Sequence, residues 1–316
     1  MPRDGSLWIR NRALTDEVFA AGNPNTVSEE EDAIIEKQDL IRSAAGFTEN
    51  SEGNRISGAI AISENVVGLK IFNDPIFAFG SAEDEYFQRL KERQAIGEHF
   101  MLPKEWLPEA KTVISFFLPF TEAVKRSNGK ESRWPSAEWL HGRIEGQVFL
   151  NSLCIYLKSQ LIQAGYESII PSLDERFWSK SGSDRDTRYP GVSYTSNWSE
   201  RHVAFVCGLG TFGLSKGLIT AKGVAGRFGS IVTAADFPPD SREYEELYEY
   251  CSKCGACAKN CPVNAITMED GKNHAICSAF LNATAVKFKP RYGCGKCQVN
   301  VPCESRIPPV IRNSGK

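Results

Sequence analysis

Four cysteines in the last part of the chain are spaced for iron–sulfur chemistry. They are Cys251, Cys254, Cys257 and Cys261, and Pro262 follows directly. This Cys-x2-Cys-x2-Cys-x3-Cys-Pro spacing is typical of ligands to [4Fe–4S] clusters, because three closely spaced thiolates can wrap three corners of a cubane. The fourth cysteine lies beyond a turn and points toward another cluster. The run therefore predicts further ligands elsewhere in the chain.

Four more cysteines follow this run, namely Cys277, Cys294, Cys297 and Cys303. Together the eight thiols suffice for two [4Fe–4S] clusters with none left over. Zinc is the competing interpretation, since Cys-x2-Cys pairs also form tetrahedral sites of four thiolates. A run of four cysteines that ends in Cys-Pro is unusual for zinc, so we favour iron.

Two cysteines stand apart from the others. We expect Cys154 and Cys207 to be small buried hydrophobes on apolar helix faces.

Composition and charge restrict the remaining possibilities. A chain of 316 residues allows about two domains, and 41% hydrophobic with 24% charged residues is ordinary globular usage. The net charge of -2 gives no strong attraction to nucleic acid or anionic lipid. Residues 251–316 hold 10 basic and 3 acidic residues, whereas the rest of the chain holds 27 and 36. The basic excess would offset coordinated thiolates; a basic face for RNA is the other interpretation.

No segment predicts export or a membrane span. The longest apolar run covers residues 113–119, far short of the roughly 18 residues that a spanning helix needs. The first residues contain neither an apolar signal core nor a twin arginine. A reducing compartment keeps clustered thiols free for metal. We therefore predict a cytoplasmic protein with no membrane partner.

Helices and strands alternate through the part of the chain that precedes the cysteine run. The pattern predicts one helix that ends near Gly46 and further helices at 83–95, 135–165, 200–206 and 242–250. It predicts strands at 58–63, 66–72, 111–118, 166–170, 217–221 and 228–234. A polar loop is predicted at 174–199 and a linker at 236–240. This alternation predicts an α/β fold, with α+β as the other possibility. We divide the chain into an N-terminal helical segment (1–50), an α/β domain (51–237) and a cysteine-rich domain (238–316).

The cysteine pattern resembles the ferredoxin-type module of epoxyqueuosine reductases and of their relatives, the cobalamin-dependent reductive dehalogenases. Segments 107–119, 200–213 and 229–233 are similar to the same family, so the resemblance extends over about 107–303. It implies a nitroreductase-like corrinoid-binding domain followed by a ferredoxin-like domain with two [4Fe–4S] clusters. The implied ligand sets are Cys251, Cys254, Cys257 and Cys303 for cluster one, and Cys261, Cys277, Cys294 and Cys297 for cluster two. Residues 298–302 form a longer spacer before Cys303 than the family's usual three residues.

The resemblance also implies a cobalamin held by a glycine-rich segment. The implied residues are Arg201, Gly208, Leu209, Gly210, Thr211, Phe212, Gly213, Ser215 and Lys216. Glycines remove side chains where backbone approaches a bulky group. Without the resemblance, a helix C-cap followed by turn glycines explains the same pattern. Arg143 and Arg201 could grip a phosphate or a corrinoid amide, although such residues more often form ion pairs near the surface.

Tyr194 is the candidate proton donor. It lies six residues before Glu200, where epoxyqueuosine reductases carry an aspartate, and reductive dehalogenases use a tyrosine as their acid. The other interpretation of Tyr194 is an aromatic side chain that packs under the 174–199 loop.

Three functions follow from these observations. The first is an oxidoreductase that takes electrons from a low-potential donor, such as a ferredoxin or flavodoxin, and passes them through two clusters to a cobalamin and a small organic substrate. The second is epoxyqueuosine reductase itself acting on tRNA, which the replaced aspartate and the acidic main domain disfavour. The third is a non-catalytic electron-transfer or corrinoid-activating protein. For the first two, the glycine-rich segment and the 174–199 loop should line one pocket facing cluster two.

Overall fold

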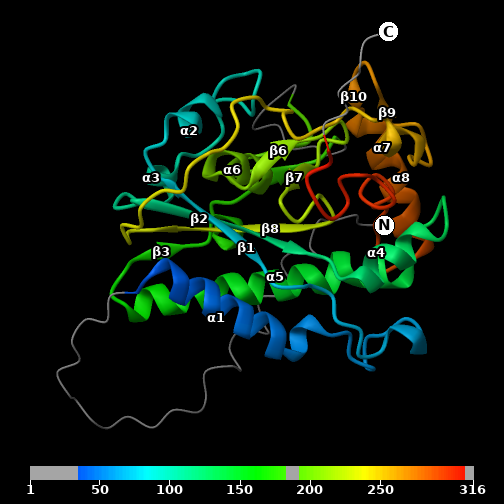
Figure 1. The fold of residues 1–316 in the computed structure, drawn as a ribbon, viewed down its shortest axis with the longest axis horizontal. Coiled ribbons are helices and arrows are strands. Elements are labelled where there is room, and N and C mark those ends of the chain that lie inside the picture. The colour runs from blue at the N-terminus through cyan, green and yellow to red at the C-terminus, as the bar shows by residue number, and fades with distance from the viewer. Residues whose placement is uncertain (1–34, 183–191, 310–316) are drawn as a thin grey trace. The chain divides into compact units, whose positions relative to one another are not determined.

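The computed structural model describes residues 35–182 and 192–309, which belong to one compact unit spanning Ile34–Lys316. Its centre is an antiparallel sheet with the strand order β1-β2-β8-β3. The strands are β1 (Ile76–Ser81), β2 (Thr112–Pro119), β8 (Gly226–Thr233) and β3 (Ser168–Ile169). Helices cover both faces of this sheet (Figure 1). The mixed α/β class is therefore confirmed, in the antiparallel form that an α+β fold implies.

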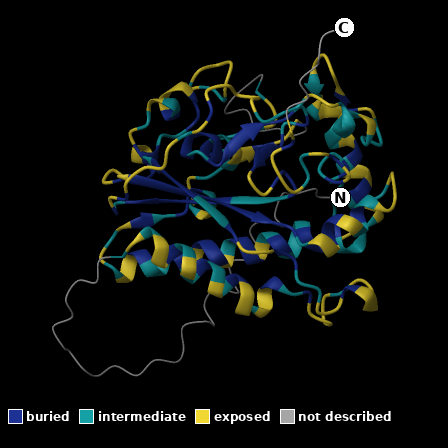
Figure 2. Cartoon of the chain, in the orientation of Figure 1, coloured by how far each residue is buried: buried dark blue, intermediate teal, exposed yellow. Residues whose placement is uncertain are grey.

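Strand β2 lies in the middle of the sheet because it is apolar along most of its length. All eight of its residues are buried, as expected for a strand with helices on both faces. It pairs with β1 from Ile76 opposite Phe117 and with β8 from Thr112 opposite Thr233. The dark strands at the centre of Figure 2 show this burial.

One face of the sheet is covered by the long helix α5 (Ala137–Gln163), with α1 (Lys37–Asn50) on its outer side (Figure 1). Helix α5 begins after Ser136, whose hydroxyl accepts a hydrogen bond from the Trp139 amide. Phe47 of α1 stacks on Tyr156 of α5 with ring centroids 4.5 Å apart. This layer and the sheet form the larger hydrophobic core.

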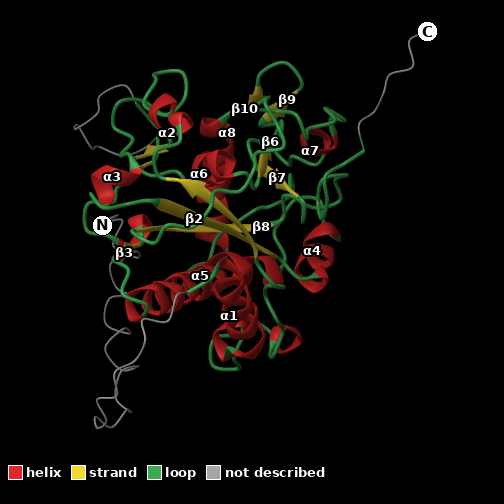
Figure 3. Cartoon of the chain, turned by 60° about the vertical axis from the view of Figure 1, so that its left-hand side comes forward, coloured by secondary structure: helices red, strands yellow, loops and turns green. Residues whose placement is uncertain are grey.

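The opposite face is covered by α6 (Glu200–Cys207), together with the short helices α2 (Glu85–Arg89) and α3 (Pro103–Trp106) (Figure 3). The centre of this second core is Trp198, which is fully buried, stacks on Phe100 and meets Trp106 edge to face. Because Trp198 lies just before α6, this packing fixes the start of the helix.

The cysteine-rich part lies at one end of the sheet, beside α4 (Glu122–Gly129) and the start of α5 (Figure 1). It contains α7 (Ala256–Lys259), the pair β9 (Ile266–Thr267) and β10 (Gly271–Lys272), and α8 (His274–Lys287). The remaining short elements are η3 (Glu52–Asn54), η4 (Glu64–Val66), η5 (Pro171–Leu173), β4 (Ser179–Lys180), β5 (Thr195–Ser196), β6 (Gly210–Phe212) and β7 (Leu218–Thr220). The domain boundary placed after residue 237 stays a prediction.

Several predicted elements are confirmed and others are wrong. The strands β2, β7 and β8 and the helices α5 and α6 lie where the pattern placed them. The segments 58–63 and 66–72 contain turns and η4 in place of strands, and only single bridges pair Arg55 with Lys70 and Phe72 with Phe120. The acidic segment 242–250 forms turns because its side chains bind α6, as described below. The start of the first predicted helix lies outside the described residues. Over the described ranges, no helix combines the length and apolar character that a membrane crossing requires.

Candidate iron–sulfur sites

The fold gathers the eight clustered thiols around two cavities. Cys251, Cys254, Cys257 and Cys303 line the first cavity, which has a volume of about 20 Å³. Cys261, Cys277, Cys294 and Cys297 line the second cavity, which has a volume of about 230 Å³. In the part of the chain that the structure describes, no three His, Cys, Asp or Glu side chains approach closely enough to hold a single metal ion. The thiols of each set therefore border a cavity and do not meet at the position of one metal ion.

Local backbone geometry brings the first set together. Gly255 has a φ of 74° and directly precedes α7, which carries Cys257. Cys303 reaches the same cavity from the far end of the cysteine-rich part. Its carbonyl accepts a hydrogen bond from the Val224 amide at 2.9 Å, and the Glu304 carbonyl accepts one from Ala225. These bonds tie the last cysteine to the chain that enters β8.

The second set comes from separate segments of the chain. Cys261 follows α7, Cys277 lies in the first turn of α8, and Cys294 and Cys297 belong to the loop after it. Asn128 of α4 donates a hydrogen bond to the Cys294 carbonyl at 2.9 Å. The Lys296 ammonium donates to the Asn128 carbonyl at 2.7 Å. The end of α4 therefore holds the loop that presents two of the four thiols.

Burial makes these thiols hard to ionise without a cation. It raises the pKa of Cys257 to about 11 and the pKa of Cys294 and Cys303 to about 12, and neighbouring cysteines contribute to each rise. Metal coordination deprotonates a thiol outright, because the cation supplies the charge that burial withholds. Each set offers the four thiolates that a [4Fe–4S] cluster would take.

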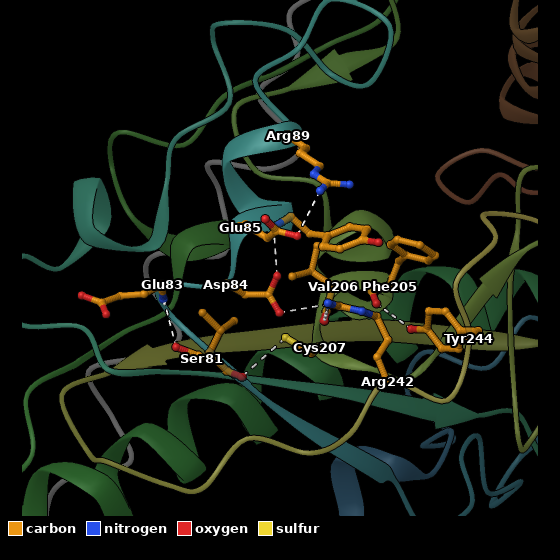
Figure 4. Close-up of polar contacts among 12 residues, drawn as sticks. Ser81, Glu83, Asp84, Glu85, Arg89, Phe205, Val206, Cys207, Arg242 and Tyr244 are labelled. Atoms are coloured by element: carbon orange, nitrogen blue, oxygen red, sulfur yellow. Dashed lines mark hydrogen bonds and ion pairs between the residues drawn. The ribbon is translucent and has the colours of Figure 1, made fainter.

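The segment before the first cysteine is anchored to α6 (Figure 4). Arg242 forms an ion pair with Asp84 at 3.0 Å and donates to the Val206 carbonyl at 2.6 Å. The Tyr244 hydroxyl donates to the Phe205 carbonyl at 2.5 Å. These contacts replace the helix that the sequence predicted at 242–250, because long side chains reach the last carbonyls of α6 and hold this stretch against it.

Cationic and aromatic side chains complete the second cavity. The cationic residues are Arg143 of α5, Arg201 of α6, Arg227 of β8, Lys272 of β10 and Lys296. Trp139, Phe120 and Phe280 supply aromatic surface. Sequence reasoning identified Arg143 and Arg201 as groups that could hold an anion, but it missed Arg227, Lys272 and Trp139. Arg227 could have indicated this site in the sequence, because it is a charged residue within a strand, β8, that contains no other charge.

Residues 209–212 of the glycine-rich segment are buried within the chain itself. Thr211 has no exposed surface, and Leu209 and Phe212 belong to the second hydrophobic core. Gly208 closes α6 with a φ of 103°, which is the helix C-cap that the alternative interpretation gave. A Cβ on Gly210 would lie 1.9 Å from the Ile219 carbonyl oxygen, so this glycine serves the β6–β7 hairpin. The chain's own packing therefore accounts for these glycines.

The remaining residues assigned to the corrinoid divide between the two cavities. Gly213 and Ser215 line the first cavity and Arg201 lines the second. The Lys216 carbonyl accepts a hydrogen bond from Arg201 at 2.8 Å. Binding of cobalamin by this chain stays a prediction.

Tyr194 lies outside the lining of both cavities. Its ring stacks on His274 with centroids 5.4 Å apart, and His274 begins the helix that carries Cys277. Tyr194 has a φ of 58°, which is uncommon for a residue with a side chain. Among the described residues, none from the 174–199 loop lines either cavity, and residues 183–191 of that loop lie outside the described residues.

Glu200, next to Arg201 in the sequence, is not among the residues that line the second cavity. Within residues 35–182 and 192–309, its carboxylate oxygens have no donor in hydrogen-bond geometry. Burial raises the pKa of Glu200 to about 7, and the nearby hydroxyls of Ser230 and Ser172 offset this only in part.

The two isolated cysteines are buried, as predicted. Cys154 on α5 and Cys207 on α6 are each 1% exposed. The Cys207 thiol donates to the Val113 carbonyl in the second core (Figure 4).

Comparison with known proteins supports the iron–sulfur assignment. Residues 245–267, which contain the run from Cys251 to Cys261, match the 4Fe-4S binding domain family. A stretch of 31 residues is 55% identical to pyruvate synthase subunit PorD of Methanothermobacter marburgensis, covering 10% of this chain and 38% of that protein.

Two solved structures are similar to this chain over part of its length. Epoxyqueuosine reductase from Streptococcus thermophilus is 18% identical over 72% of this chain and 62% of that one, with a TM-score of 0.44. The catabolic reductive dehalogenase NpRdhA is 14% identical over 74% of this chain and 30% of that one, with a TM-score of 0.46. The chain thus spans less than two thirds of each of these proteins. It carries an iron–sulfur segment of the 4Fe-4S binding domain family at residues 245–267, in a mixed α/β protein that is similar to epoxyqueuosine reductases and reductive dehalogenases.

Proposed function

We propose that this protein is an iron–sulfur reductase in which two [4Fe–4S] clusters carry electrons from a low-potential donor protein to a small organic substrate. The observation that carries this proposal is the division of eight thiols into two sets of four, each around its own cavity. The number of thiols in each set matches the four ligands that a [4Fe–4S] cluster takes.

We infer that the two sites exchange electrons, because Cys257 of the first set lies in α7 and Cys261 of the second set follows only four residues later. Cys254 at the first cavity is exposed, and so is the adjacent Lys253. We infer that a donor such as a ferredoxin or flavodoxin docks here, because electron transfer needs a short path from the surface to the iron.

The second cavity is the proposed site of reduction. It is the larger of the two, and cationic and aromatic side chains line it alongside the thiols. A bound substrate would therefore lie directly against the cluster. Two electrons arriving singly, with two protons from water or a side chain, would together reduce one bond of the substrate. No step is assigned to a corrinoid, since Leu209, Thr211 and Phe212 of the segment proposed to hold it are buried within the chain itself.

Anaerobic reconstitution with iron and sulfide tests this proposal. We expect about eight iron atoms per chain, from two clusters of four, and electron paramagnetic resonance signals from two interacting clusters after reduction with dithionite. Viologen-driven turnover would then be screened against halogenated aromatic acids, quinones and epoxides. Bound zinc, or iron that saturates near half this content, would contradict the two-cluster assignment.

A second candidate is an electron-transfer protein without a substrate of its own. The match to PorD favours it, because that protein is one subunit of a larger enzyme and the matched stretch is short. Reduced protein that passes electrons rapidly to a partner, and whose cluster signals no small organic molecule perturbs, would select this candidate. Perturbation of the second cluster by a small molecule would select the reductase.

A further inference from the structure

The second cavity has a strongly one-sided charge. Five cationic side chains line it, and no Asp or Glu is among those lining residues that the structure describes. Three of the cations are arginines from three different elements of the main fold: Arg143 from α5, Arg201 from α6 and Arg227 from β8. Convergence of arginines from a helix on each face of the sheet and from the sheet itself makes a built site, not a chance surface patch.

The three guanidinium groups are held in place without being neutralised. Arg227 donates through Nε to the Gln147 side-chain oxygen at 3.0 Å. Arg201 donates to the Lys216 carbonyl at 2.8 Å. Arg143 lies over the Tyr292 ring at 4.4 Å, and its buried Nε has no hydrogen-bond partner among the described residues. Across those same residues, none of the three forms an ion pair with a carboxylate.

The electrostatics agree with this geometry. Burial, together with the neighbouring Arg143 and Arg201, lowers the pKa of Arg227 to about 9. Arg227 thus experiences Arg143 and Arg201 as positive charge that Tyr292 offsets only in part, and an anion among the three arginines would relieve that repulsion.

The negative charge of a bound cluster would offset only part of the positive charge of the five cationic side chains. The five cations outnumber the four thiolates of the second set, and the iron of a cluster cancels some of the thiolate charge. Lys296 is already bound to the carbonyls of Asn128 and Glu131 at 2.7 and 2.5 Å. The arginines therefore remain available to a further anion.

We propose that Arg143, Arg201 and Arg227 bind an anionic group, a carboxylate or a phosphate, that belongs to the molecule reduced in the second cavity. Planar guanidinium groups hold both anions through paired charge-assisted hydrogen bonds. Such a contact would orient the rest of the substrate toward the thiols of the second set. The identification of the bound molecule as the substrate rests on the proposed function, whereas the anion site itself does not.

The test uses the reconstituted two-cluster protein with two probes, inorganic phosphate and 4-fluorobenzoate. After reduction, the paramagnetic second cluster should broaden the ³¹P or ¹⁹F nuclear magnetic resonance signal of a probe bound beside it. We expect saturable broadening. Arg143→Gln, Arg201→Gln and Arg227→Gln should each weaken binding about ten- to a hundredfold, the loss of one strong charge-assisted contact. The matched control Arg126→Gln removes an exposed arginine of α4 and should leave binding unchanged.

The outcomes are distinct. Tighter binding of phosphate assigns a phosphorylated substrate, and tighter binding of 4-fluorobenzoate assigns a carboxylate. Absence of saturable broadening by either probe, with both clusters intact, overturns the anion site and leaves the reductase proposal standing. Arginine variants that lose iron in parallel with probe binding would show that the arginines serve the cluster alone. Since Arg201 is exposed toward the cavity, its variant should fold even if the Arg227 variant does not.

Discussion

The two cavities contain the same number of cysteines in very different surroundings. The first is small, includes the exposed Cys254, and is otherwise lined by backbone and apolar side chains, apart from Ser215, Ser252 and Lys253. The second is larger and is surrounded by arginine, lysine and aromatic side chains. Identical ligands can therefore serve different purposes, because the residues around a cluster determine what can approach it and how readily it accepts an electron.

The two sites also differ in construction. Three of the four thiols at the first cavity come from one short run, so local spacing almost defines that site. The second cavity takes thiols from the end of α7, from α8 and from the loop after it, and takes its arginines from the main fold. Cysteines from one short run bind electron-transfer clusters in many proteins. The second cavity is assembled from distant segments, so its lining is more specific to this protein.

Removal of one ligand from each site should produce the largest effect. We expect Cys257→Ala and Cys261→Ala each to lower the iron content by about half, since each removes a ligand of one of two clusters. Cys261→Ala should abolish reduction in the second cavity altogether. Iron and sulfide analysis with electron paramagnetic resonance checks both, and Cys154→Ala, which alters a buried cysteine in α5, is the control. Equal loss of both clusters in either variant would mean that the two sites are not separable.

Replacement of the arginines should shift the potential of one cluster only. Positive charge stabilises the reduced, more negative cluster, so Arg201→Gln should lower the reduction potential of the second cluster by on the order of 50 mV, as expected for a unit charge several ångströms away. The first cluster should not change. A redox titration followed by electron paramagnetic resonance measures both values, with Arg126→Gln as control. A shift of equal size in the reduction potentials of both clusters would contradict the proposed difference between the two cavities.

Glu200 tests whether the second cavity truly lacks a neutralising carboxylate. Its folded-state pKa is raised to about 7 from 4.5, so the protonated form favours folding, and stability falls as pH rises from about 4.5 to 7. Glu200→Gln should therefore stabilise the protein at pH 8, by at most about 3 kcal/mol, and much less at pH 4.5. Thermal unfolding of the anaerobic protein at both pH values checks this, with exposed Glu64→Gln as control. Destabilisation at pH 8 would indicate that Glu200 is paired with Arg201.

Tyr194 should give the smallest effect. Because its ring stacks on His274 outside the lining of both cavities, we expect Tyr194→Phe to keep the iron content and to change turnover by about twofold at most. Loss of a general acid would slow turnover by about a hundredfold or more. A decrease of that size, with both clusters intact, would support the role as proton donor that the sequence suggested.

The sequence predicted best what local patterns encode. The apolar run of β2, the long helix α5 and the four-cysteine run follow from spacing and periodicity, and they lie where they were expected. The predicted strand at 66–72 is a short apolar stretch that packs against the larger core without forming a ladder, whereas most of segment 58–63 is exposed, including Ile60 and Ile62. In the same way, the 242–250 segment looks helical in isolation, but Arg242 and Tyr244 bind α6 instead.

The sequence indicated Arg143 and Arg201 as possible anion-binding residues, but it could not predict that they and Arg227 line one cavity. Arg143, Arg201 and Arg227 are far apart in the chain, and nothing in the local pattern relates them. The glycine-rich segment shows the opposite difficulty. Its local pattern suits both a ligand-binding loop and a hairpin, and only the close approach of Gly210 to the Ile219 carbonyl distinguishes the two.

The arrangement of the eight cysteines along the chain has a consequence for oxidative damage. Cys257 and Cys303 meet at the first cavity, and the stretch between them contains every cysteine of the second. Iron bound at the first cavity therefore closes a long loop around the second set and lowers the entropic cost of assembling it. Oxygen that destroys the first cluster should therefore raise the entropic cost of rebuilding the second after damage, whereas loss of the second leaves the outer loop closed.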